Sequence, residues 1–242
     1  MTAHPPSSIA AEPYPFALVP AVCALLIIDM QRDFLEPGGF GAMLGNDVGQ
    51  LRRTIAPNRA LLAAWRAAGL LVIHTREGHR PDLADLPPAK KLRGHGAKTI
   101  GDAGPMGRIL VRGEAGHDII PELYPMPGEP VIDKPGKGAF YATDLAAILA
   151  HAGISQLVVT GVTTEVCVNT TVREANDRGF DCLVLADCCG SYFPHFHDAG
   201  LAMIKAQGGI FGWVGQSAEV IAAIAPGRTA GLVPQPIKET AR

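Results

Sequence analysis

The sequence has few cysteines, and their arrangement excludes a disulfide scaffold. There are five among 242 residues, an odd number, and no spacing between them repeats. Neither a C-x-x-C nor an H-x-x-x-H zinc pattern is present. Free thiols of this kind fit a reducing compartment, so we expect a cytoplasmic protein.

An excess of charge of one sign is also absent. Lysine and arginine number 21, aspartate and glutamate number 23, and the net charge is −2. This balance predicts no binding to nucleic acid or to an anionic membrane. The longest mostly apolar run, residues 16–28, is interrupted by Pro20 and is too short to cross a bilayer. No lysine or arginine precedes Arg32, so we expect no secretory signal peptide.

Hydrophobic residues, in contrast, make up 48% of the chain, enough for one large core. Residues 1–22 contain five prolines and no helical period. We interpret them as an extended arm that lies on the surface or on a neighbouring subunit. We place one domain at residues 23–226 and a C-terminal tail at residues 227–242.

Strands and helices alternate through this domain. Continuous apolar runs are typical of strands that are buried on both faces. The predicted strands are residues 24–29, 70–75, 130–133, 157–161, 182–186 and 209–212, and the predicted helices are 51–68, 143–152, 166–178, 197–207 and 217–224. The alternation predicts an α/β fold, a three-layer αβα doubly wound domain with a six-stranded, mostly parallel sheet.

Three polar side chains follow predicted strands. Asp29 ends the first strand, Lys134 follows the third, and Cys167 opens the helix after the fourth. Ligands of doubly wound folds bind at the carboxyl ends of the strands, so we expect these side chains to converge there. Residues 76–129 are rich in glycine, proline and charge, and long insertions of this kind usually cover or shape a site.

Together these residues have the chemistry of an activated thiol. A free thiol titrates near about 8.5, and a helix N-terminus and a nearby ammonium group are expected to lower the pKa of Cys167. A carboxylate can accept the thiol proton and return it to a leaving amine. Taken singly, each residue has a structural alternative: Asp29 as a turn residue, Lys134 as a solvated lysine with Lys137 as its competitor, and Cys167 as a packing residue.

Three segments carry a resemblance to a known family. Residues 26–34 (LIIDMQRDF), 131–140 (VIDKPGKGAF) and 161–168 (GVTTEVCV) are similar to the signatures of the isochorismatase-like cysteine hydrolases. The resemblance covers about residues 23–226. It implies a catalytic triad of Asp29, Lys134 and Cys167, and the spacing of six residues before Phe140 selects Lys134 over Lys137.

The resemblance also implies a cis peptide between Val162 and Thr163. Its expected use is to direct the N–H of Thr163, together with that of Cys167, at an oxyanion. In the nicotinamidase branch of the family, a metal-binding Asp-x-His follows the second strand. Glu77 and Gly78 occupy that region here, and a lone His79 is more typical of a hydrogen-bonding loop residue. We therefore expect no metal and no cofactor.

Four stretches, residues 74–87, 133–138, 173–179 and 207–212, look most similar to the biuret and triuret hydrolases. These enzymes cleave a C–N bond of a ureide and release ammonia. The resemblance therefore implies a cysteine-dependent amidohydrolase, and it makes several residues candidates for substrate binding. These candidates are Gln207, Phe34, Arg76, Glu77, Phe140 and Tyr141. For Gln207, a contact that caps a helix is an equally open interpretation.

Other functions remain open at this stage. Ureidoacrylate and N-carbamoyl amino acids are alternative substrates. An isochorismatase-type vinyl ether hydrolase would not need Cys167, and an inactive interaction module would need none of the triad. The family resemblance also implies a homo-oligomer, with a tetramer favoured.

Overall fold

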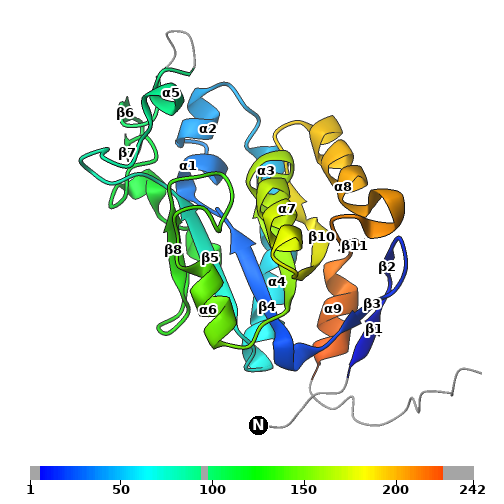
Figure 1. Cartoon of the computed structure of the whole chain (residues 1–242). Helices are drawn as coiled ribbons and strands as arrows, with labels where there is room; N and C mark the ends of the chain where they lie inside the picture. The colour runs from blue at the N-terminus through cyan, green and yellow to red at the C-terminus, as the bar shows by residue number, and fades with distance from the viewer. Residues whose placement is uncertain (1–5, 94–97, 226–242) are drawn as a thin grey trace, which may run out of the picture.

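A central sheet organises the chain, for which the computed structural model describes residues 6–93 and 98–225. The sheet has seven strands in the order β2-β11-β10-β9-β4-β5-β8 (Figure 1). The strands are β2 (Ala11–Glu12), β4 (Cys23–Ile28), β5 (Val72–Glu77), β8 (Val131–Lys134), β9 (Gln156–Val162), β10 (Asp181–Gly190) and β11 (Trp213–Gly215). All neighbours pair in parallel except β2, which is antiparallel to β11. The predicted doubly wound α/β class is confirmed.

Helices cover both faces of this sheet (Figure 1). The longer ones are α4 (Ile55–Ala67) and α9 (Ser217–Ile224) on one face, and α6 (Leu145–His151), α7 (Asn169–Asp177) and α8 (Pro194–Gly209) on the other. Side chains of β4 alternate between the two cores, with Leu25 and Ile27 in the first and Leu26 and Ile28 in the second. Burial on both faces explains why the sequence of β4 is apolar without interruption.

Short elements gather where β4, β5 and β8 end (Figure 1). They are α1 (Arg32–Leu35), α2 (Phe40–Met43), α3 (Gly49–Arg52), α5 (Pro88–Lys91), β6 (Ala103–Gly104) and β7 (Gly107–Arg108). Most belong to the predicted insertion or directly follow β4, so this end of the sheet is covered by irregular chain rather than by long helices. None of the helices within the described residues is long and apolar enough to span a bilayer.

The N-terminal segment differs from the predicted arm. Its strands β1 (Ser7–Ile9) and β3 (Phe16–Leu18) pair with each other, while β2 adds a seventh strand to the sheet. Ile9, Phe16 and Leu18 are buried in the core that contains α9. These side chains attach the segment to its own domain. The predicted tail, residues 227–242, and the first five residues lie outside the described residues.

Several predicted boundaries are also corrected. The sixth strand, predicted at 209–212, begins at Trp213, because Gly209 and Gly212 have φ angles of 87° and 144°, in the left-handed region that favours glycine. The helix predicted at 51–68 is two helices, α3 and α4, separated at residues 53 and 54. The helix predicted at 166–178 starts with a π-helical turn, Thr164–Val168, before α7.

Candidate active site

An ion pair that is buried from solvent lies at the carboxyl ends of β4 and β8. Asp29 directly follows β4 with a φ angle of 51°, and Lys134 ends β8. The Nζ atom of Lys134 lies 2.7 Å from Oδ2 of Asp29. The hydroxyl of Thr75 donates a hydrogen bond to Oδ1 of Asp29 over 2.7 Å. A non-glycine residue in the left-handed region is typical of sites where the surrounding structure enforces the conformation.

The Lys134 ammonium group is fully coordinated by oxygen. Besides its ion pair with Asp29, it donates to the carbonyls of Gly136 at 3.1 Å and Lys137 at 3.0 Å. Burial lowers the pKa of Lys134, but the charges of Asp29 and Glu77 outweigh burial and raise it overall. The group is therefore a permanent positive charge beside Asp29.

The third member of the predicted triad reaches the same place from β9. Cys167 lies in the π-helical turn after β9 and is 4% exposed. Its Sγ atom donates to Oε2 of Glu77 over 3.6 Å, and ligand atoms of Asp29, Glu77 and Cys167 lie within 4.8 Å of one another. The structure thus brings Asp29, Lys134 and Cys167 together at one edge of the sheet.

The thiol is not ionised by its surroundings, in contrast to the expectation from the sequence. Burial raises the pKa of Cys167 well above its ordinary value. Lys134 and Lys137 act to lower the pKa, but the nearby carboxylates of Asp29 and Glu77 raise it again. The thiol therefore keeps its proton at neutral pH, and any attack by sulfur requires a base that removes this proton.

The sequence did not predict the surroundings of Glu77, although it made Glu77 a candidate for substrate binding. Its carboxylate is 1% exposed and accepts from Lys137 at 2.7 and 2.9 Å and from Lys90 at 3.3 Å. Burial raises the pKa of Glu77, but the charges of Lys134, Lys137 and Lys90 lower it to about 2. Glu77 is consequently a stable anion that holds two lysines next to the thiol.

The atoms of this cluster do not favour a metal ion. Asp29, Glu77 and Cys167 offer three ligand atoms in one place. The Lys134 ammonium group, however, already lies on Asp29, and that of Lys137 lies on Glu77. A divalent cation would have to displace these positive charges, which form the ion pairs that neutralise the buried carboxylates.

Local backbone around the nucleophile agrees with the prediction from the resemblance. The peptide bond between Val162 and Thr163 is cis. Gly161 has a φ angle of 111°, and a Cβ atom there would collide with the carbonyl of Ile28 in β4. Only glycine fits this close approach of two strands, which aligns the turn carrying Cys167 with the end of β4.

The structure shows what surrounds each of the predicted substrate-binding residues, whose binding roles stay predictions. Gln207 has an exposed side chain and a φ angle of 52° at the break near the end of α8, and Gly209 packs against Pro13. Gln207 therefore lies close to the N-terminal strands. Arg76 points to the opposite face of β5 from Thr75 and Glu77, and it binds Asp133 at 2.7 Å.

The three predicted aromatic residues have different surroundings. Phe34 packs against the first core, and its carbonyl accepts from the Tyr192 hydroxyl at 2.8 Å. Phe140 is buried in the second core, and its ring stacks on Phe180 at 5.9 Å. Tyr141 is 61% exposed and lines a cavity. Of the three, Tyr141 is the one in the lining of this cavity, and the binding roles of all three stay predictions.

Two residues that the sequence analysis did not single out, Gln31 and Lys90, contact Glu77. The buried side chain of Gln31 accepts from the Glu77 N–H at 2.7 Å and donates to the Glu77 carbonyl at 3.0 Å. Lys90 comes from α5, within the insertion, and also contacts His79 at 3.0 Å. The only sequence feature that pointed to Lys90 was its position within the insertion of residues 76–129. His79 is a hydrogen-bonding residue, since its Nδ1 atom lies 3.2 Å from Asp85.

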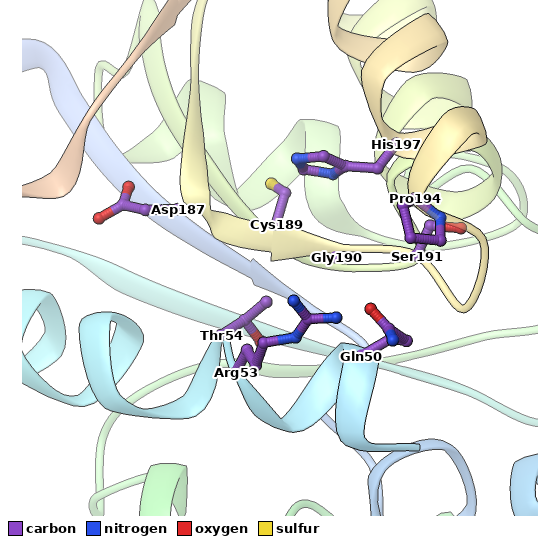
Figure 2. Close-up of a pocket in the computed structure, with 9 residues that line it drawn as sticks. All are labelled: Gln50, Arg53, Thr54, Asp187, Cys189, Gly190, Ser191, Pro194 and His197. Atoms are coloured by element: carbon purple, nitrogen blue, oxygen red, sulfur yellow. The ribbon is translucent and has the colours of Figure 1, made fainter. Parts of the chain in front are cut away.

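Two cavities adjoin the carboxyl ends of the strands. The larger, of about 610 Å³, is lined by Lys137 and by Pro135 and Gly136 of the same loop. The Lys137 ammonium group contacts Glu77, whose carboxylate accepts from the Cys167 thiol. The smaller, of about 180 Å³, lies at the end of β10, where α8 contributes His197 and the turn between α3 and α4 contributes Arg53 (Figure 2). None of the predicted site residues lines this smaller cavity.

The charge of Glu77 has a measurable consequence for acid stability. Its pKa is about 2 in the folded chain against an ordinary value of 4.5 for an unfolded one, so its stabilising contribution is complete above about pH 4.5 and is lost as the pH falls towards 2. Between pH 6 and pH 3, the free energy of unfolding should fall by about 2 kcal/mol more in the native chain than in Glu77→Gln. Urea titrations at both pH values measure this difference. Glu219→Gln, at an exposed position, is the control, and an equal pH slope in the native chain and Glu77→Gln contradicts the prediction.

Comparison with known proteins extends these observations. The isochorismatase domain model matches residues 23–219. A cysteine hydrolase from Pseudomonas syringae pv. phaseolicola 1448A has a similar structure, with 26% identity, a TM-score of 0.74 and coverage of 90% of this chain and 97% of that one. An isochorismatase family protein from Desulfovibrio vulgaris subsp. vulgaris str. Hildenborough has 26% identity and a TM-score of 0.68, with coverage of 84% and 98%. N-carbamoylsarcosine amidase from Thermoplasma acidophilum shares the fold at 24% identity and a TM-score of 0.62, with coverage of 81% and 97%.

Proposed function

The chain belongs to the isochorismatase family of hydrolases, and from this premise we propose that it is a cysteine-dependent amidohydrolase. It cleaves a C–N bond of a small ureide, with biuret and triuret as the first candidates, and releases ammonia. The observation that carries the proposal is the buried Asp29–Lys134 ion pair, at 2.7 Å, within reach of the Cys167 thiol. A thiol, a base and a fixed positive charge are the parts that nucleophilic catalysis requires.

The first step is attack of sulfur on the ureide carbonyl. Asp29 removes the thiol proton as the C–S bond forms, and the carbonyl electrons move to oxygen. Glu77 also touches the thiol, but its pKa of about 2 makes it a poor proton acceptor. Lys134 stays protonated, fixes the orientation of Asp29 and stabilises the negative charge that develops on sulfur.

The negative oxygen of the tetrahedral intermediate is held by the N–H groups of Thr163 and Cys167. In support of this role, the N–H of Thr163 donates no hydrogen bond within the described residues. A donor that is left unpaired beside a nucleophile is available to a developing oxyanion. Lys134 lies too deep for this task, since its ammonium group is buried, forms an ion pair with Asp29 and donates to two backbone carbonyls.

Collapse of the intermediate breaks the C–N bond. Asp29 returns its proton to the departing nitrogen, which leaves as ammonia, and the acyl group remains on Cys167. Water then attacks the acyl carbon while Asp29 takes one of its protons. The C–S bond breaks, the proton passes to sulfur, and the resting thiol is restored.

Substrate contacts come from the cavity side of the thiol. Of the predicted binding residues, Tyr141 lines this cavity, and Glu77 lies behind Lys90 and Lys137, which also line it. Amide N–H groups of a ureide can donate to the Glu77 carboxylate, and its carbonyl oxygens can accept from Lys137. Biuret and triuret differ in length, and the larger cavity has room for either.

Ammonia release across a panel of amides tests the proposal. The panel contains biuret, triuret, allophanate, an N-carbamoyl amino acid, ureidoacrylate and nicotinamide. We expect ammonia from at least one ureide with the native chain and none with Cys167→Ala. Ammonia from no member of the panel would exclude a ureide amidohydrolase. Pyruvate release from isochorismate that survives in Cys167→Ala would identify the vinyl ether hydrolase instead.

A further inference from the structure

We infer that Lys90, from α5 in the insertion, is a positioning residue of the active site, whose ammonium group fixes Glu77 and the loop after Lys134 relative to each other. For its effect on turnover, the inference rests on the proposed amidohydrolase function. The contacts of Lys90 are with Glu77, His79 and Pro135, so it acts on the reacting groups through other residues.

The ammonium group of Lys90 has three acceptors from separate parts of the chain. Its Nζ atom lies 3.3 Å from Oε1 of Glu77, 3.0 Å from Nε2 of His79 and 2.5 Å from the carbonyl oxygen of Pro135. Burial and the charge of Lys90 lower the pKa of His79, so its ring is neutral at neutral pH and Nε2 can accept. An ammonium group carries three protons, one for each of these acceptors.

The two segments that Lys90 joins carry the reacting groups. Glu77 ends β5, and its carboxylate accepts from the Cys167 thiol. Pro135 directly follows Lys134, whose own ammonium group is held by two carbonyls of the same loop. A displacement of Pro135 would move these carbonyls and change the coordination of Lys134. Lys90 therefore constrains the geometry of both the thiol's acceptor and the catalytic lysine.

Packing of α5 does not explain why Lys90 is directed inwards. None of the four residues of α5 is buried, and the backbone N–H groups of Lys90 and Lys91 donate only to the carbonyl of Pro87. Within the described residues, Lys90 is the one side chain of α5 that forms hydrogen bonds, and it is 20% exposed. Burial lowers the pKa of Lys90, and the charge of Glu77 only partly opposes this effect. An ammonium group placed here at a cost in solvation is typical of a functional contact.

The charge of Lys90 also influences which carboxylate accepts the thiol proton. Besides Lys90, the titratable groups near the Glu77 carboxylate are Lys134, Lys137, Cys167 and Asp29. The three lysines outweigh burial and lower the pKa of Glu77 to about 2. With one of them removed, Glu77 becomes a stronger base beside the thiol and competes with Asp29 for its proton. Lys90 thus helps to keep Glu77 out of the proton transfer.

Titration of the Glu77 carboxylate tests the inference without any substrate. Lys90→Met removes the charge and keeps a side chain of similar length, and Lys91→Met, at an exposed position on the same turn, is the matched control. The carboxyl carbons of glutamate are labelled with ¹³C, and the signal missing from Glu77→Gln identifies Glu77. We expect Lys90→Met to raise the pKa of Glu77 by about one unit or more, while Lys91→Met leaves it unchanged.

Steady-state ammonia release measures the effect on turnover. We expect kcat of Lys90→Met to fall by roughly tenfold or more with KM within about threefold of the native value, because Lys90 holds reacting groups rather than the substrate. Lys91→Met should keep the native kcat. Thermal unfolding establishes that each variant is folded, and Lys90→Gln repeats the experiment with a polar side chain.

Three results would overturn the inference: an unchanged pKa of Glu77 in Lys90→Met, a native kcat in that variant, or a loss confined to KM, which would make Lys90 a substrate contact. The proposed function is scored separately. Ammonia release by the native chain with an unaltered Lys90→Met retains the amidohydrolase and refutes the positioning role. With no ammonia from any ureide, the proposed function fails, and the titration of Glu77 still decides whether Lys90 controls this carboxylate.

Discussion

Replacement of Cys167 by serine should abolish ammonia release while the substrate still binds. Serine is nearly the same size, so the buried turn that follows β9 has room for it. A serine hydroxyl is a much weaker acid than a thiol, and the single base Asp29 is arranged for a thiol proton. We expect turnover to fall by roughly a thousandfold or more, the usual consequence of losing a nucleophile. Substrate affinity, measured by calorimetry, should change by less than about threefold.

Cys189→Ser is the matched control for this experiment. Cys189 is also buried, but it lies in β10 at the smaller cavity and donates to the Val159 carbonyl. Its replacement should leave turnover nearly intact. Activity of Cys167→Ser within tenfold of the native chain would exclude the covalent mechanism, because the intermediate could not then depend on sulfur.

Replacement of Lys134 by methionine should damage both stability and activity. The side chains of Lys134 and Asp29 are both inaccessible to solvent. Methionine fills the same space but leaves the Asp29 charge buried without its partner, which typically costs about 3–5 kcal/mol. Asp29 would also lose its orientation, and we expect activity to fall by roughly a thousandfold.

The double variant Asp29→Asn with Lys134→Met separates the two effects. Removing both charges together eliminates the unpaired carboxylate, so much of the stability should return. Activity should stay lost, because no base remains. Urea unfolding and ammonia release measure the two quantities. A double variant that is as unstable as Lys134→Met would show that the ion pair is not what stabilises this region, and recovery of activity would exclude Asp29 as the base.

The predicted homotetramer and cytoplasmic location stay predictions. Exposed apolar side chains do lie on α8 (Phe196 and Met203) and directly before it (Phe193). A homo-oligomer that covers them would bury substantial apolar surface.

The positions of the triad could be predicted because they depend on local pattern. Asp29 and Lys134 each end a strand whose apolar run is visible in the sequence, and Cys167 follows a third such run. Parallel strands bring their carboxyl ends to one edge whatever the details of packing. The surroundings of residues outside these strand ends could not be predicted in this way, because they depend on loop geometry, and the roles predicted for Gln207, Arg76 and Phe140 stay predictions.

The sequence by itself determined the αβα architecture and placed Asp29, Lys134 and Cys167 just beyond the carboxyl ends of three strands. Only the tertiary structure decided that Glu77 lies against the thiol with Lys137 and Lys90 around it. It also decided that the pKa of Cys167 is raised rather than lowered. Periodicity records which face of a strand is buried, whereas a pKa depends on how deeply a group is buried and on charges brought from distant segments of the chain.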